Sequence, residues 1–461
     1  MAAEIILTVG ADCLLENCPG PLAGEIKKEL TVANPLYLDA KKYGRWIGKK
    51  LKPYLYFYSE TSRGLRFPRG YANQAVRFCR KHYGQESPRI VDRRRTLPEI
   101  DFSFNGELRP YQREAFEDAV RRDFGVIESG TGSGKTVIGL AIIAHRRQPT
   151  LILVHTKELL HQWAAQIEEF LECPAGLIGD GHFSLEPVTV AIVNSARNRL
   201  AELPERFGQI CVDECHRVPA SLFTEVVTAF DCRYALGLSA TAFRRDGLTN
   251  LIHLYLGECV HRVAADDLHA SGAVLQPEFI QKSTEFSYGY RGNYQNLLKA
   301  LTSNAERNRL ICRDVVDEAG RGEGTILVVS DRVAHCEALA GIVSGMAPQL
   351  KVAVLTGKMP SEQRSALIDD IRNGGIDVLI STVQLIGEGF DCPGLRTLFL
   401  TTPIKFSGRL LQVVGRILRP SAGKQPRVYD YADPVRVLQS SARSRSLTFK
   451  NLRSEPDGQT G

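Results

Sequence analysis

The sequence has no long apolar run. Over its 461 residues, no hydrophobic stretch approaches the roughly 20 residues that a membrane-spanning helix needs. Its apolar start, Met1–Val9, is short, contains Glu4 and lacks a basic segment, so we expect a strand there and not a signal peptide. These absences predict a cytoplasmic protein that has no membrane partner.

The cysteines lack the pairing and spacing of a cross-linked or zinc-bound fold. There are eleven of them, an odd number. The closest pairs are Cys13/Cys18 and Cys211/Cys215, and neither is accompanied by a second pair at the spacing of a zinc site. We therefore expect plain thiols without a disulfide framework.

Acidic residues are scarce between Lys41 and Arg95. This stretch contains sixteen Lys or Arg, three acids and ten aromatic residues, and its net charge of +13 exceeds the +6 of the whole chain. Cations attract phosphates and aromatic rings stack on bases. The stretch therefore predicts nucleic-acid binding, with Arg93, Arg94 and Arg95 as its densest cluster. In the alternative, the aromatic residues form a core and the cations form a solvated face.

Beyond about residue 105, short apolar runs alternate with helical stretches, a pattern typical of parallel sheets covered on both faces. A linker is expected within Ser271–Asn304, where glycines and polar residues gather. A helical stripe of Leu159, Trp163, Ile167 and Phe170 predicts core packing. Strands are expected at Gly125–Glu128, Thr150–His155, Val188–Asn194, Gln209–Asp213, Ala235–Ser239, Thr325–Ser330, Lys351–Leu355, Asp377–Ser381 and Thr397–Thr401.

A glycine-rich turn follows the first of these strands. Backbone N–H groups in such a turn can surround a polyphosphate, and the helix that follows directs its positive end at the same charge. Lys135 is expected to reach the β- and γ-phosphates, and the Thr136 hydroxyl is expected to bind Mg²⁺. The turn itself consists of Gly130, Thr131, Gly132, Ser133 and Gly134.

Two adjacent carboxylates, Asp213 and Glu214, lie at the end of a later apolar strand, downstream of the glycine-rich turn. A hydrolytic site needs one carboxylate to hold a metal ion's shell and another to orient water. Asp213 fits the first role and Glu214 the second.

Several short motifs accompany these two features in a fixed order. In that order and spacing they resemble the conserved motifs of superfamily-two DExH-box helicases, over about residues 106–435. The Arg245–Gly247 run is similar to the XPB and phage UvsW group, which acts on DNA. The motifs are Leu108–Gln112, Val126–Thr136, Val154–Leu159, Val193–Ser195, Asp213–His216, Ser239–Thr241, Val329–Ser330, Thr356–Gly357 with Arg364, Ser381–Thr382 with Gly387–Asp391, and Gln412–Arg419.

The resemblance implies an α/β fold with two tandem RecA-like parallel-sheet domains, over residues 106–272 and 273–450. They follow a small basic α+β N-terminal domain over residues 1–105 and precede a flexible tail over residues 451–461. It also implies an ATP site with Mg²⁺ held through Thr136 and Asp213. Its catalytic residues would be Lys135, Asp213, Glu214, Gln412, Arg416 and Arg419, and further ATP contacts would come from Arg109, Gln112, Gly389 and Asp391.

Nucleic-acid contacts are implied at Thr156, Lys157, Asn194, Ser195, Ser330, Thr356 and Thr382. The expected function is that of an ATP-dependent DNA helicase or translocase in DNA repair, replication restart or genome maintenance. It would be nucleoid-associated, act on single-stranded, duplex or branched DNA, and work with nuclease or repair partners.

Three alternatives stay open. The chain could be the motor subunit of a restriction or mobile-element defence complex, although it has no nuclease signature of its own. It could be an RNA helicase, which the sequences of Val154–Leu159 and Gln412–Arg419 disfavour. It could also be a nucleotide-switched clamp without productive hydrolysis, which the intact catalytic set disfavours.

Overall fold

The computed structural model describes most of the chain and divides it into two compact units. The division falls between Val263 and Ala264, with the loop residues Gly130–Ser133 grouped with the second unit. The described residues are 4–42, 46–47, 51–84, 87–130, 132–216, 220–240, 249–272, 275–322, 324–357, 359, 361–387, 394–404, 410, 413–415, 417–418 and 424–451. The expected tail therefore lies almost wholly outside them.

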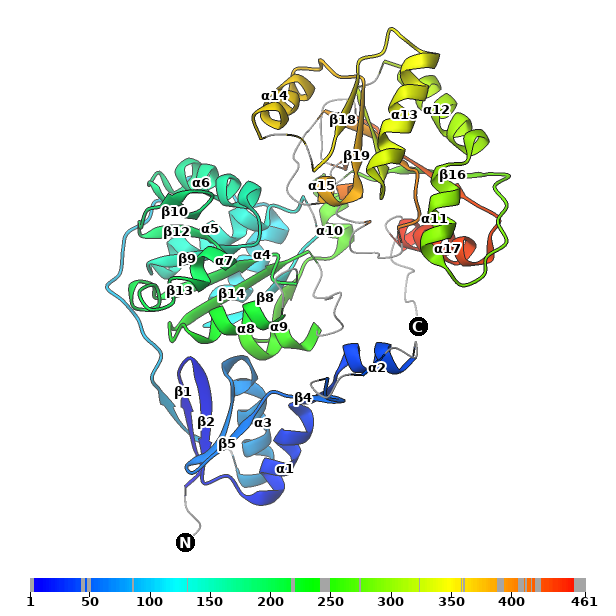
Figure 1. Cartoon of the computed structure of the whole chain (residues 1–461). Coiled ribbons are helices and arrows are strands. Elements are labelled where there is room, and N and C mark those ends of the chain that lie inside the picture. The colour runs from blue at the N-terminus through cyan, green and yellow to red at the C-terminus, as the bar shows by residue number, and fades with distance from the viewer. Residues whose placement is uncertain are drawn as a thin grey trace, which may run out of the picture. The chain divides into compact units, whose positions relative to one another are not determined.

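The first unit begins with a small α+β domain built on a five-stranded sheet of order β5-β6-β2-β1-β7 (Figure 1). Its apolar residues alternate along the strands and bury Leu7, Leu15 and Phe67 against α1 and α3. The elements are β1 (Ile6–Val9), β2 (Asp12–Glu16), α1 (Gly20–Glu29), β3 (Thr31–Ala33), α2 (Pro35–Lys42), β4 (Tyr54–Tyr56), β5 (Ser59–Thr61), β6 (Gly64–Pro68), η1 (Arg69–Tyr71), α3 (Ala72–Tyr83) and β7 (Arg89–Asp92).

An eight-stranded sheet of order β11-β10-β12-β9-β13-β14-β8-β15 completes the first unit. All its pairings are parallel except that of β10 with β11, and α4, α5 and α6 pack together on one face while α7, α8 and α9 pack together on the other. The elements are α4 (Pro110–Val120), β8 (Phe124–Glu128), α5 (Lys135–Arg146), β9 (Thr150–Val154), α6 (Lys157–Leu171), β10 (Ala175–Gly179), β11 (His182–Phe183), β12 (Val188–Ile192), α7 (Val193–Arg197), η2 (Pro204–Arg206), β13 (Gln209–Asp213), α8 (Ala220–Thr228), β14 (Tyr234–Ser239), α9 (Thr249–Leu256) and β15 (Cys259–Arg262).

The second unit contains a six-stranded parallel sheet of order β16-β21-β20-β17-β19-β18. With the first unit it confirms the predicted fold class. The elements are α10 (Ala265–Ala270), β16 (Glu278–Ser283), α11 (Tyr294–Thr302), α12 (Ala305–Ala319), β17 (Thr325–Ser330), α13 (Val333–Met346), β18 (Val352–Leu355), α14 (Ser361–Arg372), β19 (Val378–Thr382), α15 (Val383–Gly387), β20 (Leu395–Leu400), β21 (Arg427–Ala432) and α17 (Arg436–Asn451).

The stretch expected to hold a linker is structured over much of its length. Ser271–Asn304 contains β16, which pairs along β21, and α11, which packs on α17. Leu297, Leu298 and Leu301 are buried there with Leu438. The glycines on either side of these elements favour a loop, whereas the apolar residues within them form a strand and a helix.

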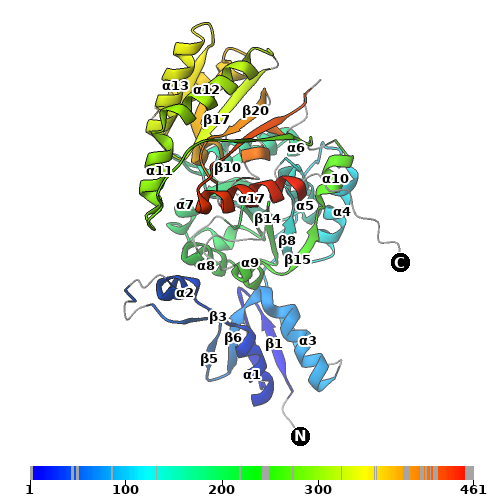
Figure 2. The same ribbon diagram turned by 90° about the vertical axis from the view of Figure 1, so that its right-hand side faces the viewer.

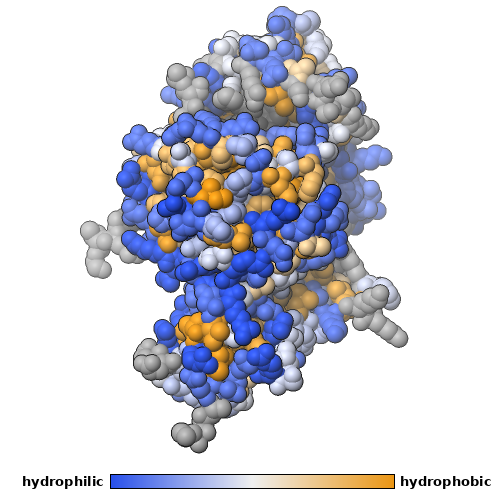
Figure 3. All heavy atoms as spheres, turned by 90° about the vertical axis from the view of Figure 1, so that its left-hand side faces the viewer, coloured by the Kyte–Doolittle hydropathy of each residue, from blue (hydrophilic) through white to orange (hydrophobic). Residues whose placement is uncertain are grey.

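The surface of the described chain is largely polar, and apolar residues reach the face drawn in Figure 3 in separate patches. Within the described part of the chain, no helix combines the length and apolar character that crossing a membrane requires. All ten cysteines whose state is described are free thiols, as expected.

The N-terminal domain is joined to the eight-stranded sheet through a buried arginine. Arg69 is 1% exposed, and its Nη1 donates to the carbonyls of Phe230 and Cys232 at 3.2 and 2.9 Å. Gly70 lies so close to α9 that an added Cβ would meet the His253 carbonyl oxygen at 2.4 Å. The short helix η1 therefore packs directly against the backbone of the domain built on the eight-stranded sheet.

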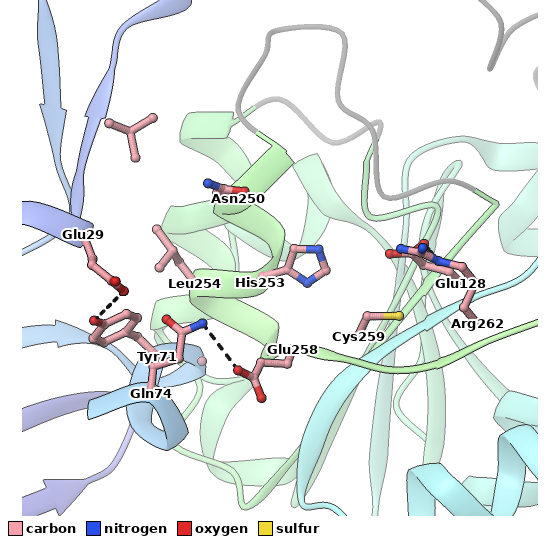
Figure 4. A pocket seen from close by; sticks show the side chains of 12 residues that line it. Glu29, Tyr71, Gln74, Glu128, Asn250, His253, Leu254, Glu258, Cys259 and Arg262 are labelled. Atoms are coloured by element: carbon pink, nitrogen blue, oxygen red, sulfur yellow. Dashed lines mark hydrogen bonds and ion pairs between the residues drawn. The ribbon is translucent and has the colours of Figure 1, made fainter. Parts of the chain in front are cut away.

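A pocket of about 430 Å³ lies beside this junction (Figure 4). On one side the Tyr71 hydroxyl donates to Glu29 at 3.0 Å, and on the other Gln74 donates to Glu258 at 3.4 Å. Arg77 forms an ion pair with the same Glu258. These contacts tie α1, η1 and α3 to the start of β15.

Arg69→Ala is expected to lower the thermal unfolding midpoint of the first unit. The substitution leaves two buried carbonyls without their donor, and each such group costs about 1–3 kcal/mol. The midpoint can be followed by circular dichroism, with Arg80→Ala as a matched control because Arg80 is an exposed arginine on α3. Equal midpoints for the two variants would contradict the assigned role of Arg69.

Candidate nucleotide and nucleic-acid sites

The predicted phosphate loop connects β8 to α5. Gly132 and Gly134 have φ of 89° and 76°, in the left-handed region that favours glycine. A Cβ on Gly134 would also meet the Gln112 side-chain nitrogen at 2.4 Å, so only glycine fits. Lys135 begins α5, and its Nζ donates to the Ser129 carbonyl at 3.0 Å. The lysine side chain is thus folded back over the turn. Phosphate oxygens bound in the turn would replace the Ser129 carbonyl as its partner.

Gln112 connects the start of α4 to this loop. Its side-chain oxygen accepts a hydrogen bond from the Arg109 backbone N–H at 2.9 Å, while its amide nitrogen faces Gly134. Gln112 is 5% exposed, so the amide is held in place. Arg109 is the N-cap residue of α4. The two residues expected to contact the nucleotide's base therefore lie next to the phosphate loop.

The carboxylates end β13, as predicted. The Trp163 indole donates to Asp213 Oδ2 at 2.8 Å, and the Glu214 backbone N–H donates to Oδ1 at 2.8 Å. Burial, followed by the neighbouring Glu214 carboxylate, raises the pKa of Asp213 to about 6. Lys135 Nζ lies 3.9 Å from Glu214 Oε1, so the loop lysine and both acids share one site.

The role of Trp163 was not predicted from the sequence. Its side chain packs in the core as expected, at 1% exposure, but its indole also holds the Asp213 carboxylate. The buried stripe of α6 runs through Leu160 and Leu171 rather than Leu159 and Phe170. A buried tryptophan needs a partner for its N–H, and this requirement was the available signal.

A second contact joins the acidic motif to the next strand. His216 Nδ1 lies 2.8 Å from Ser239 Oγ and 3.3 Å from Glu214 Oε2. Ser239 ends β14, which pairs with both β13 and β8. The histidine therefore connects Glu214 to the strand that lies between β13 and β8.

The described residues suit a nucleotide-bound Mg²⁺ better than a metal held by protein alone. They contain no group of three or more His, Cys, Asp or Glu side chains placed to hold a metal ion. Mg²⁺ usually takes one or two protein oxygens and fills its shell with phosphates and water. The Asp213 carboxylate and the Thr136 hydroxyl in the first turn of α5 provide such a pair.

The nucleic-acid residues predicted in the first unit share one edge of the sheet. Thr156 caps α6 by accepting from the Leu159 N–H at 3.3 Å, and Lys157 is exposed. Asn194 and Ser195 lie on α7, directly after β12. Because β12 pairs with β9 up to Ile192 and Val154, both segments leave the sheet at neighbouring positions.

In the second unit, Thr382 and Gly357 line a hollow of about 570 Å³ together with Arg332. Thr356, next to Gly357, is partly exposed where β18 ends, and β18 pairs with β19, which ends at Thr382. The two predicted segments are therefore brought together beside a cation. Arg332 was not predicted, and nothing in its local sequence distinguishes it.

Ser330, predicted as a nucleic-acid contact, is buried and hydrogen-bonded within the second unit. Its side chain is fully buried, and Oγ accepts the Arg332 backbone N–H at 3.1 Å and lies 2.9 Å from His335 Nδ1. Burial lowers the pKa of His335 to about 3, so the ring is neutral, and its Nε2 contacts Asn308 at 3.0 Å. Ser330 organises the start of α13 instead.

Arg94 and Arg95, predicted as nucleic-acid contacts, form ion pairs within the first unit. Arg94 forms ion pairs with Asp92 and Asp123 at 2.7 and 2.8 Å, and its side chain is 9% exposed. Arg95 pairs with Asp231 at 3.0 Å. Both fasten the N-terminal domain to the motor, so their charge is already neutralised. Arg93 is exposed.

Several predicted site residues fall outside the described part of the chain. This holds for Thr131 in the phosphate loop and for the run Arg245–Gly247. It also holds for Gly389, Asp391, Gln412, Arg416 and Arg419 in the second unit.

Two family models match the chain. Residues 105–244 match the family described as type III restriction enzyme, res subunit, and residues 307–421 match the helicase conserved C-terminal domain. The DNA 3'-5' translocase XPB2 of Sulfurisphaera tokodaii is 27% identical over 346 residues, which cover 68% of this chain and 79% of that protein. The ATP-dependent DNA helicase uvsW of Enterobacteria phage T4 is 24% identical over 443 residues, covering 88% of this chain and 85% of that protein.

Among solved structures, S. cerevisiae Dbp5 bound to RNA and ADP BeF3 aligns with a TM-score of 0.54 and 14% identity, covering 74% of this chain and 87% of that one. At this identity the likeness concerns the fold. With the family matches and the motif geometry, it defines the class of protein. The chain belongs to the superfamily-two helicases, nucleotide-driven motors with two RecA-like domains that use ATP and act on nucleic acid.

Trp163→Phe is expected to shift the pH dependence of ATP hydrolysis. The indole hydrogen bond lowers the pKa of Asp213, so its loss should raise that pKa. Asp213 holds Mg²⁺ only as a carboxylate, and the Mg²⁺ requirement should therefore rise as the pH falls, beginning at a higher pH in the variant. The Mg²⁺ concentration for half-maximal ATPase, measured over a pH series, checks this. Superimposable curves for variant and parent would show that the hydrogen bond does not set the ionisation of Asp213.

Proposed function

We propose that this chain is an ATP-driven DNA helicase or translocase that acts in DNA repair, replication restart or genome maintenance. One observation carries the proposal. In the eight-stranded sheet, the residues expected to bind the nucleotide follow β8 and β13. The residues expected to bind nucleic acid follow β9 and β12 of the same sheet. The DNA specificity is supported by relatives described as a DNA translocase and a DNA helicase.

The nucleotide site would work through its charge arrangement. Lys135 would leave the Ser129 carbonyl to bind the phosphates, and Asp213 with Thr136 would hold Mg²⁺, which neutralises developing charge on the phosphoryl group. Glu214 lies beside Lys135, where it would orient the attacking water. Gln112 and Arg109 would contact the adenine, and the backbone of Gly130–Gly134 would surround the phosphates.

The second motor domain would supply the remaining groups. From their motif positions, Arg416 and Arg419 would stabilise the transferring phosphoryl group, and Gln412 would help to position water. Gly389 and Asp391 would contact the bound nucleotide. We place the domain boundaries near residues 105, 272 and 450, on the motif order.

DNA would be held through its backbone by Thr156, Lys157, Asn194 and Ser195 in one motor domain and by Thr356 and Thr382 in the other. The substrate would be single-stranded, duplex or branched DNA, with nuclease or repair proteins as partners. A second candidate, the motor of a restriction complex, is favoured by the description of the family that matches residues 105–244. That role requires a nuclease on another chain.

The ATPase rate measured side by side with single-stranded DNA, duplex DNA, forked DNA and RNA tests the function. We expect stimulation by DNA to exceed stimulation by RNA. Lys135→Ala should abolish hydrolysis and leave DNA binding intact, because the two sites use different residues. Glu214→Gln should bind ATP normally and fail to turn over. Stimulation by RNA alone would overturn the DNA assignment, and wild-type turnover by Glu214→Gln would overturn the role of that acid.

Arg416→Ala is expected to slow ATP turnover by about 10³–10⁵, the usual effect of losing an arginine finger. Because the arginine would act on the transition state, ATP affinity should change far less than the rate. Steady-state ATPase and equilibrium binding of a fluorescent ATP analogue separate the two effects. A variant that loses affinity but keeps its maximal rate would place Arg416 in ground-state binding instead.

A further inference from the structure

The strand β15 carries the chain out of the first unit. It is an edge strand of the eight-stranded sheet and lies beside β8, which leads into the phosphate loop (Figure 2). Residues up to Val263 belong to the first unit, and the chain from Ala264 onward belongs to the second. The end of β15 therefore connects the sheet that carries the nucleotide site to the second motor domain.

The end of β15 is bonded to the end of β8 through one residue, Glu128. Its backbone carbonyl accepts a hydrogen bond from the Val263 N–H at 2.9 Å. Its side-chain Oε2 accepts another from Arg262 Nε at 2.7 Å, and Figure 4 shows the two side chains next to each other. Arg262 lies directly opposite Glu128 in the strand register. The main chain and the side chain of one residue thus hold the point where the chain leaves the first unit.

The Glu128 carboxylate is buried, which distinguishes this ion pair from one on the surface. Glu128 is 8% exposed, whereas the Arg262 side chain is 71% exposed. Removing the cation from a buried pair leaves an uncompensated charge in a poorly solvated place, which is costly. Among the residues that the structure describes, Arg262 is the one cation paired with Glu128. The buried acid therefore fixes the position of an arginine that the solvent would otherwise leave free to move.

A second bond attaches β15 to the helix that is expected to contact the nucleotide's base. His261 Nδ1 lies 2.8 Å from Asp118 Oδ2, and Asp118 is on α4, the helix that carries Gln112. Neighbouring residues of a strand point to opposite faces of the sheet, so His261 reaches α4 on one face while Arg262 meets Glu128 on the other. β15 is therefore connected both to the base-contacting helix and to the strand that enters the phosphate loop.

The two strands are packed too closely to slide along one another. The register of β15 on β8 is irregular between Cys259 and His261, and a Cβ on Gly125 would meet Val260 Cγ1 at 2.2 Å. Such irregularities fix the register of a strand on its neighbour. A displacement at the end of β8 is therefore passed to β15.

The nucleotide changes the bonding at this end of β8. Lys135 Nζ donates to the Ser129 carbonyl at 3.0 Å, and bound phosphates would replace that partner. Ser129 directly follows Glu128, so the change occurs at the adjoining peptide. Within the second unit, Leu268 of α10 is 5% exposed, and a Cβ on Gly130 would lie 3.2 Å from Leu268 Cδ1. The chain that follows β15 thus also packs against the first glycine of the phosphate loop.

We propose that Glu128 and Arg262 are positioning residues that couple the nucleotide site to the second motor domain. Phosphate binding draws Lys135 away from Ser129, and the end of β8 shifts. Glu128 passes this shift through Arg262 and the adjoining backbone to the chain that enters the second unit. The inference rests on the proposed function, since it takes ATP and DNA to bind at separate sites of one motor.

The coupling is measured as the factor by which an ATP analogue changes DNA affinity. Oligo(dT) binding to the full chain is followed by fluorescence anisotropy, with and without adenylyl imidodiphosphate and Mg²⁺. Coupled sites typically change each other's affinity about 5- to 150-fold, and we expect a factor in this range for the wild-type chain. Arg262→Ala should bring the factor close to unity, while each ligand alone keeps its wild-type affinity.

Arg77→Ala is the matched control. Arg77 is also an exposed arginine, and it is paired with Glu258, which directly precedes β15. This variant removes an ion pair of the same type and should keep the wild-type factor. Arg262→Lys retains a cation opposite Glu128 and should restore most of the factor. Equal factors for Arg262→Ala and Arg77→Ala overturn the proposal, because the Arg262 pair would then only stabilise the fold.

Glu128→Gln provides a second, independent variant. It removes the charge of the buried partner and leaves Arg262 in place, so the factor should fall as it does in Arg262→Ala. Thermal unfolding followed by circular dichroism identifies any variant that does not fold, and the proposal is then decided on the other one. A folded Glu128→Gln chain with the wild-type factor overturns the proposal.

The wild-type chain separates the two possible failures. If DNA stimulates its ATPase but Arg262→Ala keeps the factor, the coupling role of the pair is overturned and the proposed function stands. The same conclusion follows if DNA stimulates the ATPase but the analogue leaves wild-type oligo(dT) affinity unchanged. If no DNA stimulates the wild-type ATPase, the proposed function itself has failed.

Discussion

The hydrogen bond from the Trp163 indole to Asp213 is the contact on which the motor's first unit depends. It places an acid that must ionise inside a hydrophobic core, where the charged form is costly. The indole, the Glu214 backbone and the nearby Lys135 offset that cost. The same helix, α6, begins at the cap residue Thr156, about 10 Å away along its axis at roughly 1.5 Å per residue. One rigid element thus connects an expected DNA contact to the acid that is expected to hold Mg²⁺.

The strand order arranges the rest of the nucleotide site around this bond. β14 lies between β13, which ends in the carboxylates, and β8, which leads into the phosphate loop. Ser239 at the end of β14 contacts His216, and His216 contacts Glu214. A displacement of the carboxylates or of the phosphate loop would therefore be transmitted to β14, which lies between them. This is the physical basis on which hydrolysis could alter the segment that follows Ser239.

The central strands and the phosphate loop could be predicted from sequence because their signals are local. Continuous apolar runs and closely spaced glycines suffice for β8, β9, β13 and β17. The edge strands β15 and β16 and the internal strand β21 were missed, since their residues alternate or lie between glycines and pair with partners far along the chain. The burial of Ser330 could not be predicted, because a motif position says nothing about burial. The ion pairs of Arg94 and Arg95 could not be predicted from a local charge count, because their partners Asp123 and Asp231 lie well outside the counted stretch.

The N-terminal domain shares a unit with the eight-stranded sheet, joined to it by the buried Arg69 and by the close approach of Gly70 to α9. This junction makes the domain a fixed extension of one motor half rather than a tethered module. Any ligand held by this domain would therefore keep a constant distance from Thr156 and Asn194 through every ATP cycle.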